Sequence, residues 1–137
     1  MSSTYLNSAR RSAALLLGLV LFGAGYLGFF SEGVLLHLQV DSLQNFFHVG
    51  TGAVALIAAF EEDRFTHWAL LLLGVTLGLL SVDGFVWNGT LFDLFPLTSA
   101  DNYAYMVLSS VALVVSVWEV EKMFERPARR RLLRVRR

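Results

Sequence analysis

The sequence contains no cysteine, and only 16% of its 137 residues carry a charge. Without cysteine, the chain can form no disulfide framework and no thiolate metal site. The low charge argues against a soluble domain, in which about a quarter of the residues are charged. Disorder is excluded more firmly, because a chain with 55% hydrophobic residues cannot remain solvated. The formal net charge is zero, so the total charge alone indicates no partner.

Four long stretches lack any charged residue: residues 12–31, 42–60, 65–82 and 102–118. A helix rises about 1.5 Å per residue and the hydrocarbon core of a membrane is about 30 Å thick, so each stretch is close to the length of one spanning helix. A buried helix of a soluble bundle would show a polar stripe at helical spacing, and most of these stretches are apolar all round. They are also too long for barrel strands. The sequence therefore predicts an all-α, integral membrane four-helix bundle.

The lysines and arginines are restricted to three segments: before the first stretch, between the second and third, and after the fourth. Four spans place these segments on one side of the membrane, and the positive-inside rule makes that side the cytoplasm. It holds eleven basic and six acidic residues, whereas the outer side holds five acidic residues and no basic ones. We predict a cytoplasmic N-terminus at 1–11, a first helical hairpin at 12–60, a cytoplasmic turn at 61–64, a second hairpin at 65–120 and a basic cytoplasmic tail at 121–137.

The two predicted hairpins resemble each other in sequence. The motif Leu-Leu-Gly at 16–18 recurs at 72–74, an offset of 56 residues, and later matches have an offset of 57 residues. Because each unit has two spans, both hairpins would have the same topology, related by a pseudo-twofold axis along the membrane normal. The later matches pair Val40 with Leu97, Ser42 with Ser99, Asn45 with Asn102 and His48 with Tyr105.

Small residues recur four positions apart on the first and third helices, as Ala24 with Gly28 and Gly74 with Gly78. Small side chains let helix backbones approach closely in lipid, where no hydrophobic effect drives association. We interpret these pairs as helix-packing positions within the bundle. Membrane-helix composition alone and an oligomer interface remain alternatives.

Two polar turns carry a resemblance to a known family. One is Leu38-Gln39-Val40-Asp41 followed by Asn45 and His48, and the other is residues 91–98 followed by Asp101-Asn102. The chain resembles the bacterial family called domain of unknown function forty-three eighty-three over residues 12–118. That family has an aromatic-Pro-Val-Asn turn and a helix that starts with Asn-x-x-His. This chain departs from the turn motif, because Val40-Asp41 and Leu97-Thr98 replace Val-Asn. It also departs from the helix motif in its second half, where Tyr105 replaces the histidine. The resemblance implies a small four-helix membrane protein and no assigned reaction.

Polar residues concentrate near the outer ends of the helices. Asn45 and His48 lie one helical turn apart, Asn102 and Tyr105 repeat that spacing, and Asp83 is expected to cap the third helix. A functional interpretation is an outward-opening polar pocket where His48 and Asp83 exchange a proton or hold a cation. The structural interpretation, which we prefer, makes Asn45 and Asn102 the N-caps of their helices.

The sequence gives little support for a metal site, a haem site or an enzyme active site. Only three histidines exist, His37 and His48 on the outer side and His67 at the inner end of the third helix, and none forms a His-x-x-x-His pair. The sequence has no nucleophile elbow, phosphate-binding glycine loop or spaced carboxylate pair. We therefore predict no metal, no cofactor and no enzyme activity.

The C-terminal tail is strongly basic. Basic residues are attracted to anionic lipid headgroups by about 1 kcal/mol each, so we predict headgroup contact on the cytoplasmic side and no nucleic-acid partner. The residues expected in this contact are Arg129, Arg130, Arg131, Arg134, Arg136 and Arg137.

These features predict a structural or accessory subunit of the bacterial cytoplasmic membrane. Its expected partners are lipids and a larger membrane complex or further copies of the chain. One alternative is a transporter or channel component with the outward-opening polar pocket. Another is a pigment- or cofactor-binding membrane subunit, based on His48 and the 13% aromatic content.

Overall fold

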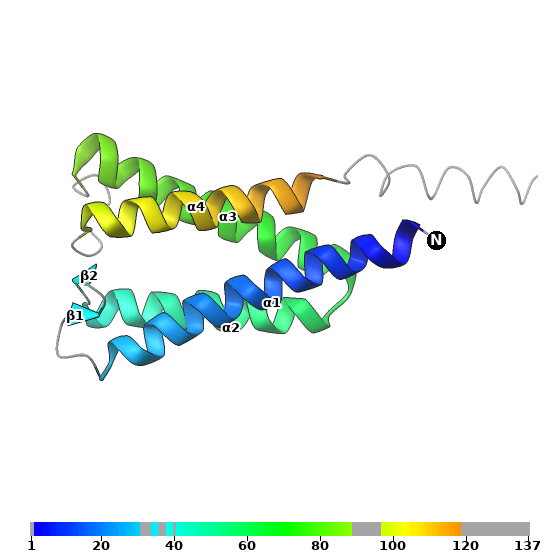
Figure 1. Ribbon diagram of the computed structural model, residues 1–137, viewed down its shortest axis with the longest axis horizontal. Coiled ribbons are helices and arrows are strands. Elements are labelled where there is room, and N and C mark those ends of the chain that lie inside the picture. The colour runs from blue at the N-terminus through cyan, green and yellow to red at the C-terminus, as the bar shows by residue number, and fades with distance from the viewer. Residues whose placement is uncertain (1, 31–33, 36–37, 40, 89–96, 119–137) are drawn as a thin grey trace, which may run out of the picture.

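The computed structural model describes residues 2–30, 34–35, 38–39, 41–88 and 97–118. These residues form four helices, α1 Ser2–Gly28, α2 Ser42–Phe60, α3 Asp63–Trp87 and α4 Ser99–Val117 (Figure 1). All four are long and apolar enough to cross a membrane. The predicted all-α membrane four-helix bundle is confirmed. The connection between α1 and α2 also holds a two-residue antiparallel ladder of β1 Val34–Leu35 and β2 Leu38–Gln39, which the sequence did not predict.

α2 coincides with the charge-free stretch 42–60, whereas the ends of α1, α3 and α4 differ from the ends of their stretches. α1 begins at Ser2, so the described part of the predicted N-terminal segment 1–11 is helical. α2 begins after Asp41, whose side chain accepts a hydrogen bond from the main-chain N–H of Leu43. α4 begins after Thr98, which forms a capping box with Asp101. The basic tail and its predicted headgroup contacts lie outside the described residues.

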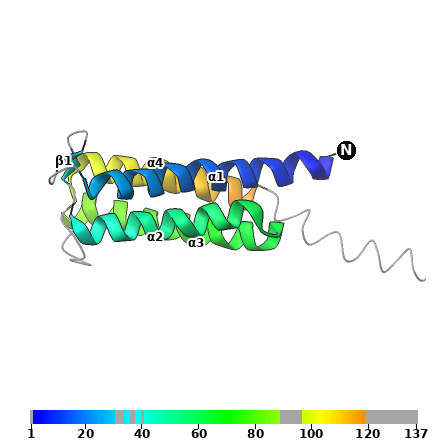
Figure 2. The same cartoon turned by 90° about the horizontal axis from the view of Figure 1, so that it is seen from below.

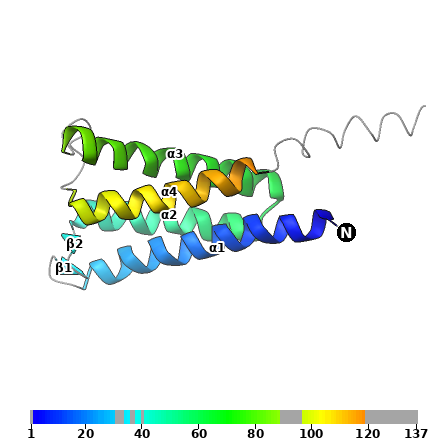
Figure 3. The same ribbon diagram turned by 45° about the horizontal axis from the view of Figure 1, so that its top comes forward.

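The bundle is built from two antiparallel hairpins, α1 with α2 and α3 with α4, packed side by side (Figures 1 and 2). The N-terminus of α1 and the α2–α3 turn lie at one end, which we call the inner end (Figure 3). The β-ladder and the start of α4 lie at the opposite, outer end. Between the ends, buried leucines and alanines from all four helices form the core: Leu17, Leu21, Ala55, Leu70, Leu73, Leu77, Leu80 and Ala112.

Each hairpin is held together by a glycine that packs against a leucine of the partner helix. A Cβ atom added to Gly18 would lie 2.8 Å from Leu56 Cγ, and one added to Gly74 would lie 2.7 Å from Leu113 Cγ. The glycines are 56 residues apart and the leucines 57, the same offsets as in the sequence. Only a residue without a side chain allows helices to approach this closely.

The small residues predicted to be helix-packing positions differ in their contacts and in their burial. Gly74 and Gly78 face α4, where Ser109 Oγ lies 2.6 Å from the Gly74 carbonyl oxygen and donates a hydrogen bond to it. On α1, Gly28 is buried and Ala24 is half-buried. A further close approach of α1 to α2, which the sequence did not indicate, occurs at Gly25.

Candidate functional site

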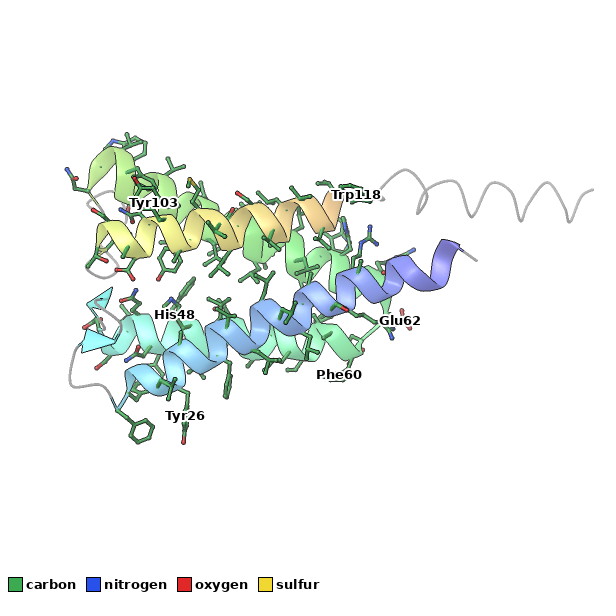
Figure 4. All side chains as sticks on the ribbon, viewed as in Figure 1. Tyr26, His48, Phe60, Glu62, Tyr103 and Trp118 are labelled. Carbon is green, nitrogen blue, oxygen red and sulfur yellow. The ribbon has the colours of Figure 1, made fainter. Side chains whose placement is uncertain are left out.

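A cluster of four polar residues joins the two hairpins near the outer end. We call it the outer cluster: Gln44 and His48 on α2, and Asp101 and Tyr105 on α4. Gln44 Nε2 lies 3.2 Å from Asp101 Oδ1 and 3.1 Å from the Tyr105 hydroxyl oxygen, and His48 Nε2 lies 2.8 Å from that same oxygen. Figure 4 shows His48 directed from α2 toward α4, whereas Tyr26 points away from the bundle.

The donors and acceptors of the outer cluster form one consistent chain. Gln44 donates to both Asp101 and Tyr105, because its amide nitrogen has two hydrogens. The Tyr105 hydroxyl then donates its own hydrogen to His48 Nε2. In that arrangement His48 is neutral and carries its hydrogen on Nδ1.

The outer cluster joins the two hairpins through two pairs of residues at one sequence separation. Gln44 and Asp101 are 57 residues apart and contact each other, and His48 and Tyr105 are also 57 residues apart and in contact. The cluster therefore marks the line along which the hairpins meet at the outer end.

The two predicted asparagine caps are wrong. The N-cap of α2 is Asp41 and that of α4 is Thr98, so Asn45 and Asn102 each lie in the second turn of their helix. Both are buried inside their own hairpins. The Asn45 carbonyl oxygen lies 2.6 Å from where a Gly25 Cβ would be, and the Asn102 carbonyl oxygen accepts a 2.9 Å hydrogen bond from Ser81.

Asp83 also lies elsewhere than predicted. It does not cap α3, which continues to Trp87 and ends at Asn88 in the left-handed conformation. The Asp83 side chain is 2% exposed, on the face of α3 that packs in the bundle. Its neighbour Gly84 lies against the Asn102 side chain so closely that a Cβ would overlap the amide. Of the five predicted pocket residues, His48 and Tyr105 contact each other directly through their side chains.

Two members of the outer cluster, Gln44 and Asp101, were not among the predicted site residues. Two sequence signals could have identified them. Gln44 precedes His48 by four residues and so shares its helix face. Asp101 is the 57-residue counterpart of Gln44.

Several buried oxygen atoms near the outer end accept no hydrogen bond. Among the described residues they are Gln44 Oε1, Asn45 Oδ1 and Asn102 Oδ1. These residues are 2–4% exposed. Buried polar atoms without partners are rare in proteins. Each of these oxygens could still accept a hydrogen bond or bind a cation.

A second polar cluster lies at the inner end and centres on Arg10. Its side chain is 5% exposed. Arg10 Nη1 lies 3.3 Å from Asp63 Oδ2, and Nη2 donates to the Ser116 carbonyl oxygen at 3.3 Å. His67 Nδ1 donates to the same carbonyl at 2.8 Å. Arg10 thus links α1 to α3 and α4. The sequence assigned Arg10 only a role in membrane orientation, because its position at the end of an apolar stretch does not reveal its burial.

An apolar groove lies between α2 and α3 on the outside of the bundle. It has a volume of about 190 Å³. Its threonines present methyl groups, since Thr51 Oγ1 donates to the Phe47 carbonyl at 2.7 Å and Thr76 Oγ1 donates to the Leu72 carbonyl at 2.8 Å. The groove is lined by Gly50, Thr51, Val54, Ala55, Ala69, Leu72, Leu73 and Thr76.

Comparison with known proteins identifies the chain's relatives. Residues 11–118 match the family model described as "Domain of unknown function (DUF4383)". The chain belongs to this family. The match covers the spanning helices, so the predicted resemblance is confirmed. Neither the curated proteins nor the solved structures contain a match. Membership of the DUF4383 family thus brings no reaction or ligand, and chemical interpretation depends on the residues described above.

Proposed function

We propose that this DUF4383 protein is an accessory subunit of a membrane assembly, and that a spanning helix of its partner packs in the groove between α2 and α3. The groove carries the proposal. Most large apolar side chains on the outside of the bundle project from its surface, as Leu72 does with 69% of its area exposed. At Gly50, Thr51, Ala55 and Ala69 the surface instead recedes. Small residues at such a place let a second helix approach closely in lipid.

The groove can be filled selectively, because Gly50 is exposed and nothing lies within 4 Å of a Cβ added there. Gly23 on α1 provides a matched control, since its added Cβ also has nothing within 4 Å and it does not line the groove. The Gly50→Phe variant should lose a protein that co-purifies with the native chain in mild detergent, and Gly23→Phe should retain it. A chain that purifies as a lone monomer, or a partner equally retained by both variants, would contradict the proposal.

We also propose that the protein lies in a bacterial cytoplasmic membrane with both termini inside. The distribution of arginines and lysines supports this orientation. Because the chain has no cysteine, single cysteines can report it directly. In intact cells, a membrane-impermeant thiol reagent should label Asp41→Cys, and should label Glu62→Cys only after the membrane is opened. The reverse pattern would overturn the orientation.

The two hairpins are proposed to be copies of one ancestral unit. Support comes from the Gly18–Leu56 and Gly74–Leu113 contacts, which occupy equivalent positions at offsets of 56 and 57 residues. A fragment containing residues 1–61 tests this idea, because an ancestral unit would have associated with a second copy of itself. The fragment should form a dimer in detergent, and a monodisperse monomer would count against duplication.

The transporter or channel alternative is less well supported. A pathway needs polar side chains at mid-membrane depth. Between the outer cluster and the Arg10 cluster, Leu17, Leu21 and Leu77 form part of the described apolar interior. The hydroxyl of the buried Ser109 donates to the Gly74 carbonyl oxygen. This arrangement favours a packed interior and an accessory role.

A further inference from the structure

We propose that the outer cluster binds one monovalent alkali cation between Asp101, Gln44 and Tyr105, with sodium as the probe. The proposal is independent of the accessory role, because it concerns a site between the two hairpins and requires no partner protein. Two observations support it separately: an unbalanced buried charge and an unpartnered buried oxygen.

The first observation is the environment of Asp101. Its side chain is buried, at 2% exposure of the residue. Oδ1 accepts from Gln44, and Oδ2 accepts from the main-chain N–H and the hydroxyl of Thr98. All of these donors are neutral. A buried carboxylate is costly unless a positive charge accompanies it.

Among the described residues, no arginine or lysine lies at the outer end to supply that charge. The sequence has none between Arg11 and Arg64, and none between Arg64 and Lys122. Arg10 and Arg11 are engaged at the opposite end of the bundle. His48 is the one other basic group in the cluster, and it is neutral when it accepts the hydrogen of Tyr105.

The second observation is the oxygen of Gln44. Gln44 is 2% exposed, and its Oε1 is buried without a hydrogen-bond partner. A half-turn of this amide about its last bond exchanges the positions of Oε1 and Nε2. In the proposed sodium-bound state, Oε1 would then lie about 3.2 Å from Asp101 Oδ1 and about 3.1 Å from the Tyr105 oxygen, the distances that Nε2 has now. The ion would replace the two hydrogen bonds that Nε2 donates in its absence.

The separations of about 3.2 Å and 3.1 Å from the Gln44 oxygen to the Asp101 and Tyr105 oxygens suit a hard cation. Oxygen ligands of cations of this size lie at about 2.4 Å, and neighbouring ligands at that radius are about 3.1–3.4 Å apart. Carboxylate, amide and phenol oxygens are the ligand types that such ions prefer. A single negative charge selects a monovalent ion, because a divalent ion would leave a buried positive charge.

His48 acts as a positioning residue in this site. By accepting the Tyr105 hydrogen at 2.8 Å, it turns the lone pairs of the phenol oxygen toward Gln44 and Asp101. The cation and the histidine therefore use opposite sides of one hydroxyl group. Loss of the imidazole should weaken sodium binding while leaving all three oxygen ligands present.

The experiment compares thermal unfolding of the full chain in detergent in NaCl and in N-methylglucamine chloride at equal ionic strength. Sodium should raise the wild-type Tm saturably, and radioactive sodium should be retained at about one ion per chain. The rise should disappear in Asp101→Asn and Gln44→Leu. Asp41→Asn removes an acidic charge at the same end and keeps a good N-cap, so it should respond like wild type.

Tyr105→Phe provides a second test if Asp101→Asn fails to fold. It removes one ligand while keeping the ring, and its half-saturating sodium concentration should rise at least several-fold. Equal Tm values in the two salts would overturn the proposal. A sodium response that Asp101→Asn retains would overturn it as well. A response to calcium without one to sodium would contradict the charge argument.

Discussion

The close packing of α1 on α2 predicts opposite effects for two alanine substitutions only two residues apart. A Cβ at Gly25 would lie 2.6 Å from the Asn45 carbonyl oxygen, 2.8 Å from His48 Cβ and 2.8 Å from the Val49 nitrogen. A carbon and a carbonyl oxygen normally approach to about 3.3–3.6 Å, so the overlap is about 0.7 Å or more. A Cβ at Gly23 would contact nothing within 4 Å.

The magnitude follows from these contacts. Overpacking a well-packed site costs about 1–3 kcal/mol, and the upper end applies at Gly25 because two of its three neighbours are main-chain atoms of a helix. Alanine regains at most about 1 kcal/mol from its better helix propensity. Gly25→Ala should therefore lower the free energy of unfolding by about 2 kcal/mol, whereas Gly23→Ala should leave it unchanged or raise it by up to about 1 kcal/mol.

Both variants can be measured by titrating the protein in mild detergent with sodium dodecyl sulfate while following tryptophan fluorescence. Gly23→Ala controls for helix propensity, since it makes the same chemical change on the same helix. Equal midpoints for the two variants would refute the α1–α2 approach seen in the structure. A stabilised Gly25→Ala would refute it more strongly.

The two polar clusters yield further predictions in the same titration. Arg10→Ala should lower the free energy of unfolding by about 1–3 kcal/mol, because Asp63 loses its buried partner. Arg11→Ala should change it by less than about 0.5 kcal/mol, since the Arg11 hydrogen bond is exposed, and similar losses for both arginines would contradict the assignment. Tyr105→Phe, measured without sodium, should cost about 1–2 kcal/mol because its hydroxyl contacts two residues of α2. The exposed Tyr103→Phe should be neutral, and a neutral Tyr105→Phe would show that the outer cluster does not hold the hairpins together.

The sequence predicted the four helices because lipid requires long apolar stretches whose length can be counted. The stretch 42–60 matched α2, but the stretch 102–118 missed the start of α4 at Ser99, because Thr98 caps that helix through side-chain hydrogen bonds that a charge-free stretch does not reveal. The predicted caps Asn45 and Asn102 were wrong because Asp41 and Thr98 cap the two helices one turn earlier.

The candidate site was predictable in part. His48 and Tyr105 were identified from their matching positions in the two halves, and they contact each other. Gln44 and Asp101 were missed because glutamine and aspartate near a helix start are usually solvated. Their burial depends on the crossing of α2 and α4, which no pattern along one helix specifies. Arg10 was missed for the same reason at the inner end.

Site-specific photocrosslinking in native membranes tests the proposed accessory role most directly. A photoreactive side chain at Leu72, on the rim of the groove and 69% exposed, should give one discrete protein adduct. The same group at Leu19, which is 55% exposed on α1 and does not line the groove, should crosslink only to lipid. A Leu72 position that also captures only lipid would contradict the account.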